Sequence, residues 1–200
     1  IKDQIIGIIG YGIQGDAQAN NLKDSGLKVI IGLKEGGSSW NKAKDDGHEV
    51  MSVAEACKKA DIIYILIPDM VQAKVYKDEI EPNLSEGNAL AFSHAAAIYW
   101  GWIKASDNVD IIMVAPKGPG SKVRETYLDG FGTPSIVAVE QDKTGTAWDR
   151  TLGIAKGIGS ARAGLIKTTF KEEVETDWFG EQADLCGGSA SMVVNAFETL

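Results

Sequence analysis

Short apolar runs alternate with longer amphipathic stretches along the first half of the chain. The runs are rich in Ile and Val, and their length is typical of strands buried on both faces of a parallel sheet. They predict strands over residues 5–9, 28–33, 61–67 and 88–92. The stretches between them have helical periodicity and end at a Gly, an Asp or a Pro-containing break, so they predict helices over 14–25, 38–46, 53–59 and 70–80.

A second set of elements follows, with strands near 109–115, 135–139 and 164–168 and a helix around 144–157. Strands joined by right-handed helical crossovers predict an α/β, doubly wound (Rossmann-like), mostly parallel sheet over residues 1–168. The segment 169–200 differs, because an acidic cluster, two glycines and a mostly apolar helix follow one another without a strand. We expect it to be the start of a second, all-helical domain that is truncated at Leu200.

The charge balance narrows the choice of partners. The formal net charge is −8, with acids and bases interspersed, which argues against a nucleic-acid or anionic membrane surface. No window approaches the run of about 18 apolar residues that a membrane helix needs. The two cysteines are consistent with a reducing, cytoplasmic location, and Cys57 lies in a helical Ala/Val pattern that predicts a core position.

A glycine-rich loop directly follows the first predicted strand and opens the first predicted helix. In a G-x-G-x-x-G loop the first glycine allows a tight turn, the second lets the backbone approach a pyrophosphate, and the third lets helix and strand pack closely. Asp16 in the next turn is a poor neighbour for a phosphate and is expected to point away. The candidate cofactor-binding residues of the loop are Gly10, Tyr11, Gly12, Ile13, Gln14 and Gly15.

The end of the second predicted strand favours NADP over NAD. An NAD enzyme usually places an acid there against the ribose 2′-hydroxyl, whereas this chain offers Lys34, Ser38 and Ser39, which suit a 2′-phosphate. Glu35 is an acid of the kind that NAD enzymes place here, so NAD remains an alternative cofactor. The alternative is a solvated loop in which Ser38 or Ser39 caps the next helix.

Polar residues follow several later strands, at the edge where ligands bind in open α/β sheets. These groups are Pro68-Asp69, Ser93-His94 and the segment from Ala115 to Gly120, which contains Lys117. His94 is as readily a satisfied structural histidine as a site residue. Lys117 is the stronger candidate, since a Pro/Gly-rich loop has no structural need for a long basic side chain.

Two carboxylates, Asp177 and Glu181, lie four residues apart on one face of a predicted helix. Such a pair repels unless a cation lies between the two, and oxygen-only ligands suit Mg²⁺. A solvated acidic helix is the alternative, but the neighbouring Trp178 and Phe179 favour a packed segment.

Taken together, these motifs resemble ketol-acid reductoisomerase, also called acetohydroxyacid isomeroreductase. The matching segments run in order over nearly the whole chain: 10–15, 32–40, 68–72, 92–94, 115–120, 156–159 and 169–182. The resemblance implies Mg²⁺-assisted alkyl migration in 2-acetolactate or 2-aceto-2-hydroxybutyrate, then reduction by NADPH, in the biosynthesis of branched-chain amino acids, including isoleucine and valine. It also implies a homo-oligomer formed through the helical domain, which would supply further metal-binding carboxylates.

The resemblance implies a role for each matching residue. His94 takes the position of the family's active-site histidine, and Lys117 would lie close to the metal-bound substrate. Asp177 and Glu181 fall at metal-binding positions. The implied cofactor contacts are Tyr11, Gly12, Ile13, Gln14, Lys34, Ser39, Asp69, Met70, Val71, Gln72 and Gly120.

Two departures from the family pattern keep other functions open. Residues 95–100 read Ala-Ala-Ala-Ile-Tyr-Trp where the family usually has Gly-Phe-Asn-Ile-His-Phe, so a loop expected to line the cofactor pocket lacks polar and aromatic members. Gly37 replaces a serine that helps to hold the 2′-phosphate. The alternatives are therefore a non-catalytic NADP-binding module, with this chain alone lacking a complete active site, and a metal-independent Rossmann dehydrogenase.

Overall fold

One eight-stranded sheet forms the centre of the computed structural model, which describes residues 1–199; Leu200, at the end of the predicted second domain, lies outside the described residues. The strand order is β3-β2-β1-β4-β5-β6-β7-β8, and only the β6–β7 pair is antiparallel. The strands are β1 (Ile5–Ile9), β2 (Lys28–Gly32), β3 (Glu49–Met51), β4 (Ile62–Ile65), β5 (Ala89–Phe92), β6 (Asp110–Pro116), β7 (Ser135–Gln141) and β8 (Leu165–Lys167). The predicted doubly wound, mostly parallel sheet is confirmed.

Each predicted strand overlaps an observed one. The structure has one further strand, β3, which the sequence did not predict. With three residues, of which only Met51 is buried, β3 is too short to produce a recognisable pattern. It pairs with β2 at the edge of the sheet.

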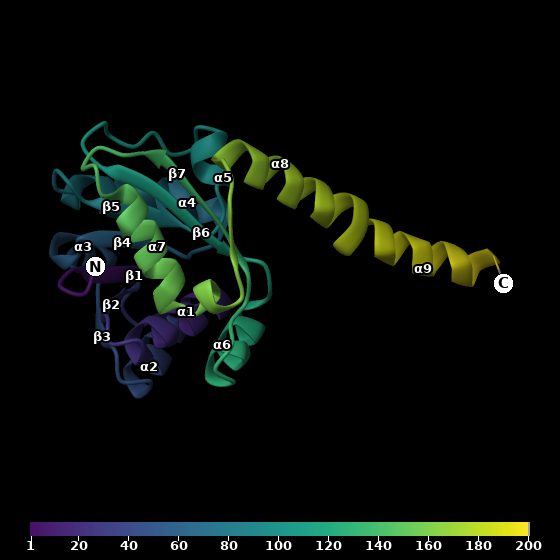
Figure 1. Cartoon of the computed structure of the whole chain (residues 1–200), viewed down its shortest axis with the longest axis horizontal. Coiled ribbons are helices and arrows are strands. Elements are labelled where there is room, and N and C mark those ends of the chain that lie inside the picture. The colour runs from purple at the N-terminus through teal and green to yellow at the C-terminus, as the bar shows by residue number, and fades with distance from the viewer. Residues whose placement is uncertain (200) are drawn as a thin grey trace.

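Helices cover both faces of the sheet (Figure 1). They are α1 (Ile13–Asp24), α2 (Ser38–Asp45), α3 (Val53–Lys59), α4 (Asp69–Val75), α5 (Ala96–Tyr99), α6 (Gly120–Leu128), α7 (Ala147–Gly157), α8 (Phe170–Gly180) and α9 (Gly188–Thr199), with the π-helical turns η1 (Tyr76–Ile80) and η4 (Glu181–Leu185) and the 3₁₀ turns η2 (Glu81–Asn83) and η3 (Ser160–Arg162). The helix predicted over 70–80 is therefore α4 continued by η1. The helix predicted from residue 144 begins at Ala147, because Thr144 instead bonds the Asp110 carboxylate and Gly145 adopts a left-handed φ of 74°.

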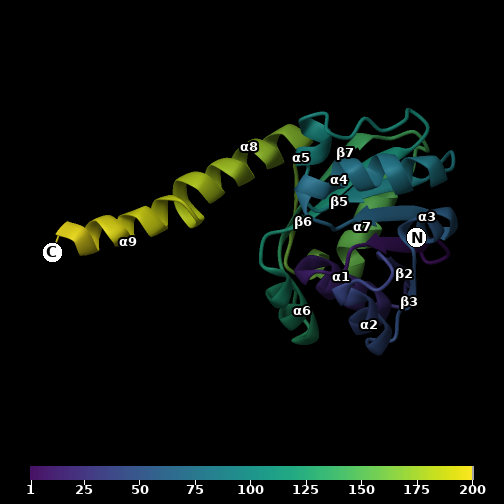
Figure 2. The same ribbon diagram turned by 180° about the vertical axis from the view of Figure 1, so that it is seen from behind.

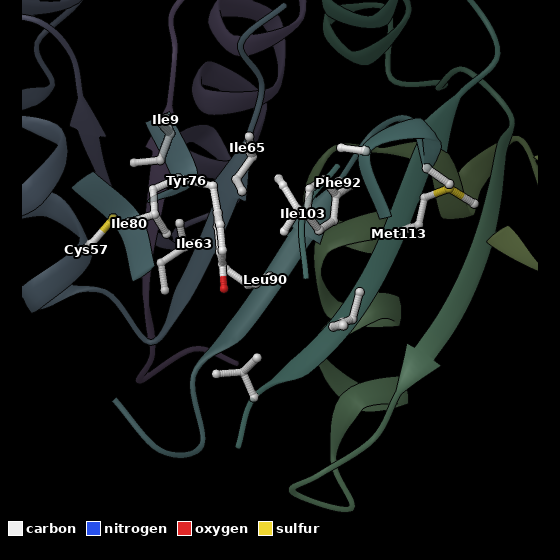
Figure 3. Close-up of a cluster of buried hydrophobic side chains, with 14 of the residues drawn as sticks. Ile9, Cys57, Ile63, Ile65, Tyr76, Ile80, Leu90, Phe92, Ile103 and Met113 are labelled. Atoms are coloured by element: carbon white, nitrogen blue, oxygen red, sulfur yellow. The ribbon is translucent and has the colours of Figure 1, made fainter. Parts of the chain in front are cut away.

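Successive strand residues face opposite sides of the sheet and feed two separate cores. On β1, Ile8 joins the core beneath α1, α2 and α7, whereas Ile9 joins the core beneath α3, η1, α5 and the start of α8. Figure 3 shows part of the second core, with Cys57 among the aliphatic side chains. Burial raises the pKa of the Cys57 thiol to about 12, as its predicted core position implies.

The C-terminal helices project away from the sheet as one rod (Figures 1 and 2). The first turns of α8 are anchored in the core through the buried Phe170, Glu173 and Val174. Farther along, Phe179, Leu185 and the apolar residues of α9 are exposed. None of the helices within residues 1–199 combines the length and apolarity needed to cross a lipid bilayer.

Candidate functional site

The glycine loop lies at the carboxyl end of β1, which pairs with β2 on one side and β4 on the other. In a doubly wound sheet this is the point where the strand order reverses and a crevice opens. Gly10 has a left-handed φ of 101°, and a Cβ on Gly15 would lie 2.3 Å from the Gly10 carbonyl oxygen. A Cβ on Gly12 would have no atom within 4 Å. The first and third glycines therefore serve packing, and the second faces open space.

A cavity of about 500 Å³ adjoins this loop. Of the predicted cofactor-binding residues, its lining includes Tyr11, Gly12, Ile13, Ser39 and Gly120. Gly120 abuts the loop, because a Cβ there would lie 2.1 Å from the carbonyl oxygen of Ile13. The Tyr11 hydroxyl donates a hydrogen bond of 2.8 Å to Asp46 at the end of α2. This bond links the loop before α1 to α2 beside the cavity.

One expectation about this cavity is wrong, and one alternative is excluded. Asp16 does not point away but lines the cavity, where its carboxylate pairs with Lys42 of α2. The serine cap is also absent: Gly37 is the N-cap of α2, without a side-chain cap, and Ser38 is the first helical residue. Lys34 and Ser38 are exposed and lie outside the lining of this cavity.

A second, smaller cavity of about 180 Å³ lies between the ends of β4, β5 and β6. Its lining includes Gln14, Asp69 and Gln72 from the predicted cofactor set, together with His94. The Gln72 amide donates to Asp69 Oδ1 at 2.9 Å, and burial raises the pKa of Asp69 above its usual value. By contrast, Met70 and Val71, with exposed fractions of 91% and 43%, are not in this lining.

The predicted catalytic and metal-binding residues meet in a third cavity, of about 550 Å³, between the strand ends and α8. His94 and Lys117 come from the loops after β5 and β6, and Asp177 comes from α8. Lys117 Nζ lies 3.1 Å from Asp177 Oδ1. Glu181, the first residue of η4, lines the same cavity, so the four-residue spacing does place both carboxylates on one side of the rod.

Glu173, which sequence reasoning did not select, lies at the base of this cavity. Its carboxylate is 1% exposed, accepts the Ala95 backbone N–H at 3.0 Å, and lies 3.1 Å from His94 Nδ1 and 3.5 Å from Lys117 Nζ. Ligand atoms of Glu173, His94 and Asp177 lie within 4.8 Å of one another. The spacing was available in the sequence, because Glu173, Asp177 and Glu181 follow one another at intervals of four.

Electrostatic coupling ties His94 to Glu173. Burial lowers the pKa of His94, but the hydrogen bond and charge of Glu173, with smaller contributions from Asp69 and Asp177, raise it above the ordinary value overall. Conversely, burial raises the pKa of Glu173, and His94, the Ala95 N–H and Lys117 outweigh that effect and lower it. Glu173 is therefore a buried, ionised carboxylate surrounded by donors.

Comparisons with known proteins show the family of the chain. Residues 1–164 match the model of "Acetohydroxy acid isomeroreductase, NADPH-binding domain", and residues 170–200 match "Ketol-acid reductoisomerase, C-terminal domain". The chain belongs to the ketol-acid reductoisomerase family. It is 83% identical to a ketol-acid reductoisomerase (NADP(+)) of Nitrosopumilus maritimus and 79% identical to one of Cenarchaeum symbiosum, over 200 residues in each case.

The match covers all of this chain but only 60% of the length of each of these two relatives. Among solved structures, an NADH-preferring ketol-acid reductoisomerase from an uncultured archaeon superposes with a TM-score of 0.95 at 46% identity, covering 99% of this chain and 61% of that one. A semialdehyde dehydrogenase NAD-binding protein from Cupriavidus necator shares the fold, with a TM-score of 0.77 at 22% identity, and covers 98% of this chain and 74% of that one.

We expected the alanine segment that departs from the ketol-acid reductoisomerase pattern to line the cofactor pocket. The three alanines do not line it. Ala95, Ala96 and Ala97 are buried in the core between α5 and α8. The segment contributes a backbone donor instead, the Ala95 N–H that binds Glu173. The three alanines therefore pack behind the site, and only the Ala95 N–H takes part in it.

Several polar groups of the site were missed because they lie on helices that pack into it from elsewhere in the chain. Lys42 and Arg124 line the 500 Å³ cavity from α2 and α6. Gln18 of α1 donates to Gln14 and to Ser93, which links the glycine loop to the loop that carries His94. Single cations and amides on amphipathic helices have no distinguishing sequence signal, since most of them are solvated.

Proposed function

We propose that this chain is the cofactor-binding part of an active ketol-acid reductoisomerase, which rearranges and reduces 2-acetolactate or 2-aceto-2-hydroxybutyrate with NADPH in the biosynthesis of branched-chain amino acids. The observation that carries the proposal is the meeting of Lys117, Glu173, Asp177 and Glu181 around one cavity. The two cofactor-side cavities lie next to it, and His94 lines both this cavity and the smaller of the two. A nucleotide-binding module without catalysis has no need of buried charge at this edge of the sheet.

The residues present fit a dinucleotide. Open space at Gly12 lets a pyrophosphate approach the N-terminus of α1, where unpaired backbone N–H groups favour anions. Ser39 and Lys42 provide a hydroxyl and a cation at the start of α2, which suit the 2′-phosphate of NADPH. Lys34, in the loop before α2, and Ser38, the first residue of α2, are proposed as outer contacts of the 2′-phosphate. Gln14, Asp69 and Gln72 would border the nicotinamide end, with Met70 and Val71 at the rim.

The residues present also fit a divalent cation of the Mg²⁺ type. Asp177 and Glu181 offer carboxylate oxygens to one cavity, and Mg²⁺ prefers oxygen ligands. A bound Mg²⁺ would polarise the carbonyl and hydroxyl oxygens of an acetohydroxy acid. In this chain Lys117 supplies a fixed positive charge toward the same oxygens, and Glu173 holds Lys117 in place.

The boundaries proposed for the two domains are 1–168 and 169–200. They are supported by the helix N-cap at Thr169 and by the exposed apolar residues of α9, which are typical of a surface that is covered in the complete protein. We propose that the helical part mediates homo-oligomer contacts. The proposed compartment is the cytoplasm, where NADPH-dependent biosynthesis and unpaired cysteines are common.

The test uses the protein extended to the length of its relatives. We expect oxidation of NADPH with 2-acetolactate that requires Mg²⁺. Asp177→Asn should lower turnover by about 100-fold or more, because one metal-ligand charge is lost, while NADPH affinity stays unchanged. Asp184→Asn is the matched control, since Asp184 is exposed and outside the lining of the 550 Å³ cavity.

Two outcomes would refute the proposal. Turnover that is equal with and without Mg²⁺ would favour a metal-independent dehydrogenase. NADPH binding without turnover at saturating Mg²⁺ would favour a non-catalytic module.

A further inference from the structure

Both ring nitrogens of His94 are engaged by side chains of α8. The indole N–H of Trp178 donates a hydrogen bond of 3.0 Å to Nε2, and Nδ1 lies 3.1 Å from Oε1 of Glu173. An indole can only donate, and a neutral imidazole carries one donor and one acceptor nitrogen. In the neutral ring Nε2 must therefore be the acceptor, and Nδ1 carries the proton that points to Glu173.

The opposite tautomer is excluded by the same two contacts. With the proton on Nε2, two N–H donors would face each other across 3.0 Å, and the Nδ1 lone pair would face the Glu173 carboxylate. Each contact would lose a hydrogen bond and gain a repulsion between like partial charges. The network of Trp178, His94 and Glu173 thus favours a single arrangement.

We propose that Trp178 is a positioning residue: its indole N–H fixes His94 as the Nδ1-protonated tautomer, so that His94 orients the Glu173 carboxylate and does not itself exchange a proton with a bound molecule. This inference rests on the proposed function, because it assigns parts within that site. It replaces the catalytic role predicted for His94 with a supporting one.

Trp178 is itself held in place by an aromatic cluster at the rim of the site. Its ring centroid lies 5.6 Å from that of Trp100 and 6.3 Å from that of Trp102, both from the segment after α5. Such pairs contribute beyond the area they bury. The cluster limits the rotation of the indole, so the donor stays directed at Nε2.

The consequence concerns the direction of the Glu173 charge. Its Oε2 accepts the Ala95 N–H at 3.0 Å, and its Oε1 faces both His94 and Lys117. If His94 no longer carries its proton on Nδ1, Lys117 is the remaining side-chain donor near Oε1 of Glu173. Lys117 would then be drawn toward Glu173 and away from Asp177, which changes the charge presented to the cavity.

The tautomer is directly measurable by ¹H–¹⁵N correlation of the imidazole nitrogens in the ¹⁵N-labelled chain. The chain has two histidines, so a His48→Gln variant assigns both sets of signals. At pH about 9, well above the usual pKa of histidine, we expect His94 to be wholly Nδ1-protonated. This reading needs neither metal nor substrate, so it stands or falls separately from the proposed activity.

Two Trp→Phe variants separate the hydrogen bond from packing. Trp178→Phe keeps an aromatic ring but removes the donor, and we expect a mixture of His94 tautomers and, in the full-length enzyme, a turnover number about tenfold lower with KM within about twofold. Trp102→Phe alters the same cluster without removing a hydrogen bond to His94, and we expect the wild-type tautomer and turnover.

Three results would overturn the proposal. One is an Nε2-protonated His94 in the unmodified chain, which needs no variant to fold. The second is an unchanged tautomer in Trp178→Phe. The third is an equal shift in Trp102→Phe, which would make packing of the cluster, and not the indole N–H, the cause.

Discussion

A single methyl group at Gly12 should separate cofactor binding from folding. In Gly12→Ala the new Cβ would meet no atom within 4 Å, and the φ of −81° suits alanine, so the folded chain accommodates it. Alanine is a poorer N-cap than glycine, and it also restricts the unfolded chain. These two effects are each about 0.5–1 kcal/mol and have opposite signs. The free energy of unfolding should therefore change by less than about 1 kcal/mol.

The effect on binding should be larger. The methyl group occupies the space through which a pyrophosphate approaches the backbone N–H groups of α1, since Gly12 lines the 500 Å³ cavity. A displacement that lengthens two or more of these hydrogen bonds should weaken NADPH binding by at least about tenfold, or about 1.4 kcal/mol. Isothermal titration calorimetry measures the affinity, and chemical unfolding measures the stability.

Gly15→Ala is the comparison, because there the Cβ would lie 2.3 Å from the Gly10 carbonyl oxygen. It should destabilise the fold by about 1–3 kcal/mol. Wild-type NADPH affinity in Gly12→Ala would refute the reasoning, because it would mean that the second glycine does not face the cofactor.

Three other predictions concern single side chains. Lys42→Met should weaken NADPH binding by about tenfold while NADH affinity changes little, and Lys44→Met, whose ammonium lies over Trp40, should change neither in the same titrations. Asp110→Ala should lower the free energy of unfolding by about 3–5 kcal/mol, measured by urea denaturation, because it leaves the buried Arg150 without its partner at 2.8 Å. Burial, followed by Lys23, lowers the pKa of His48, so the unfolded chain takes up its proton first as the pH falls. This contribution to the free energy of unfolding is present above the unfolded-state pKa of about 6.5 and is lost as the pH falls through the lower folded-state pKa. Between about pH 7 and pH 5, the free energy of unfolding of His48→Gln should therefore fall less than that of the unmodified chain in urea titrations.

The sequence by itself determined the fold class and the position of the glycine loop. The continuous buried run of β1, the left-handed Gly10 and the helix that begins at Ile13 are local features. The apolar pattern and backbone sterics therefore suffice to predict them. The acid spacing of Asp177 and Glu181 is local in the same way. The short elements β3 and α5 were not predicted, because three or four residues are too few to show a period; the nine-residue α6 was not predicted either.

Only the tertiary structure decided what surrounds His94. Its partners Glu173 and Trp178 lie 79 and 84 residues farther along the chain, and their contacts depend on where the first turns of α8 dock. The same docking buries Ala95–Ala97 and removes them from the pocket that they were expected to line. A hydrogen-bond network between distant segments requires one particular packing of helix on sheet. The pattern of apolar positions specifies that two faces meet, but it does not specify which polar groups face one another.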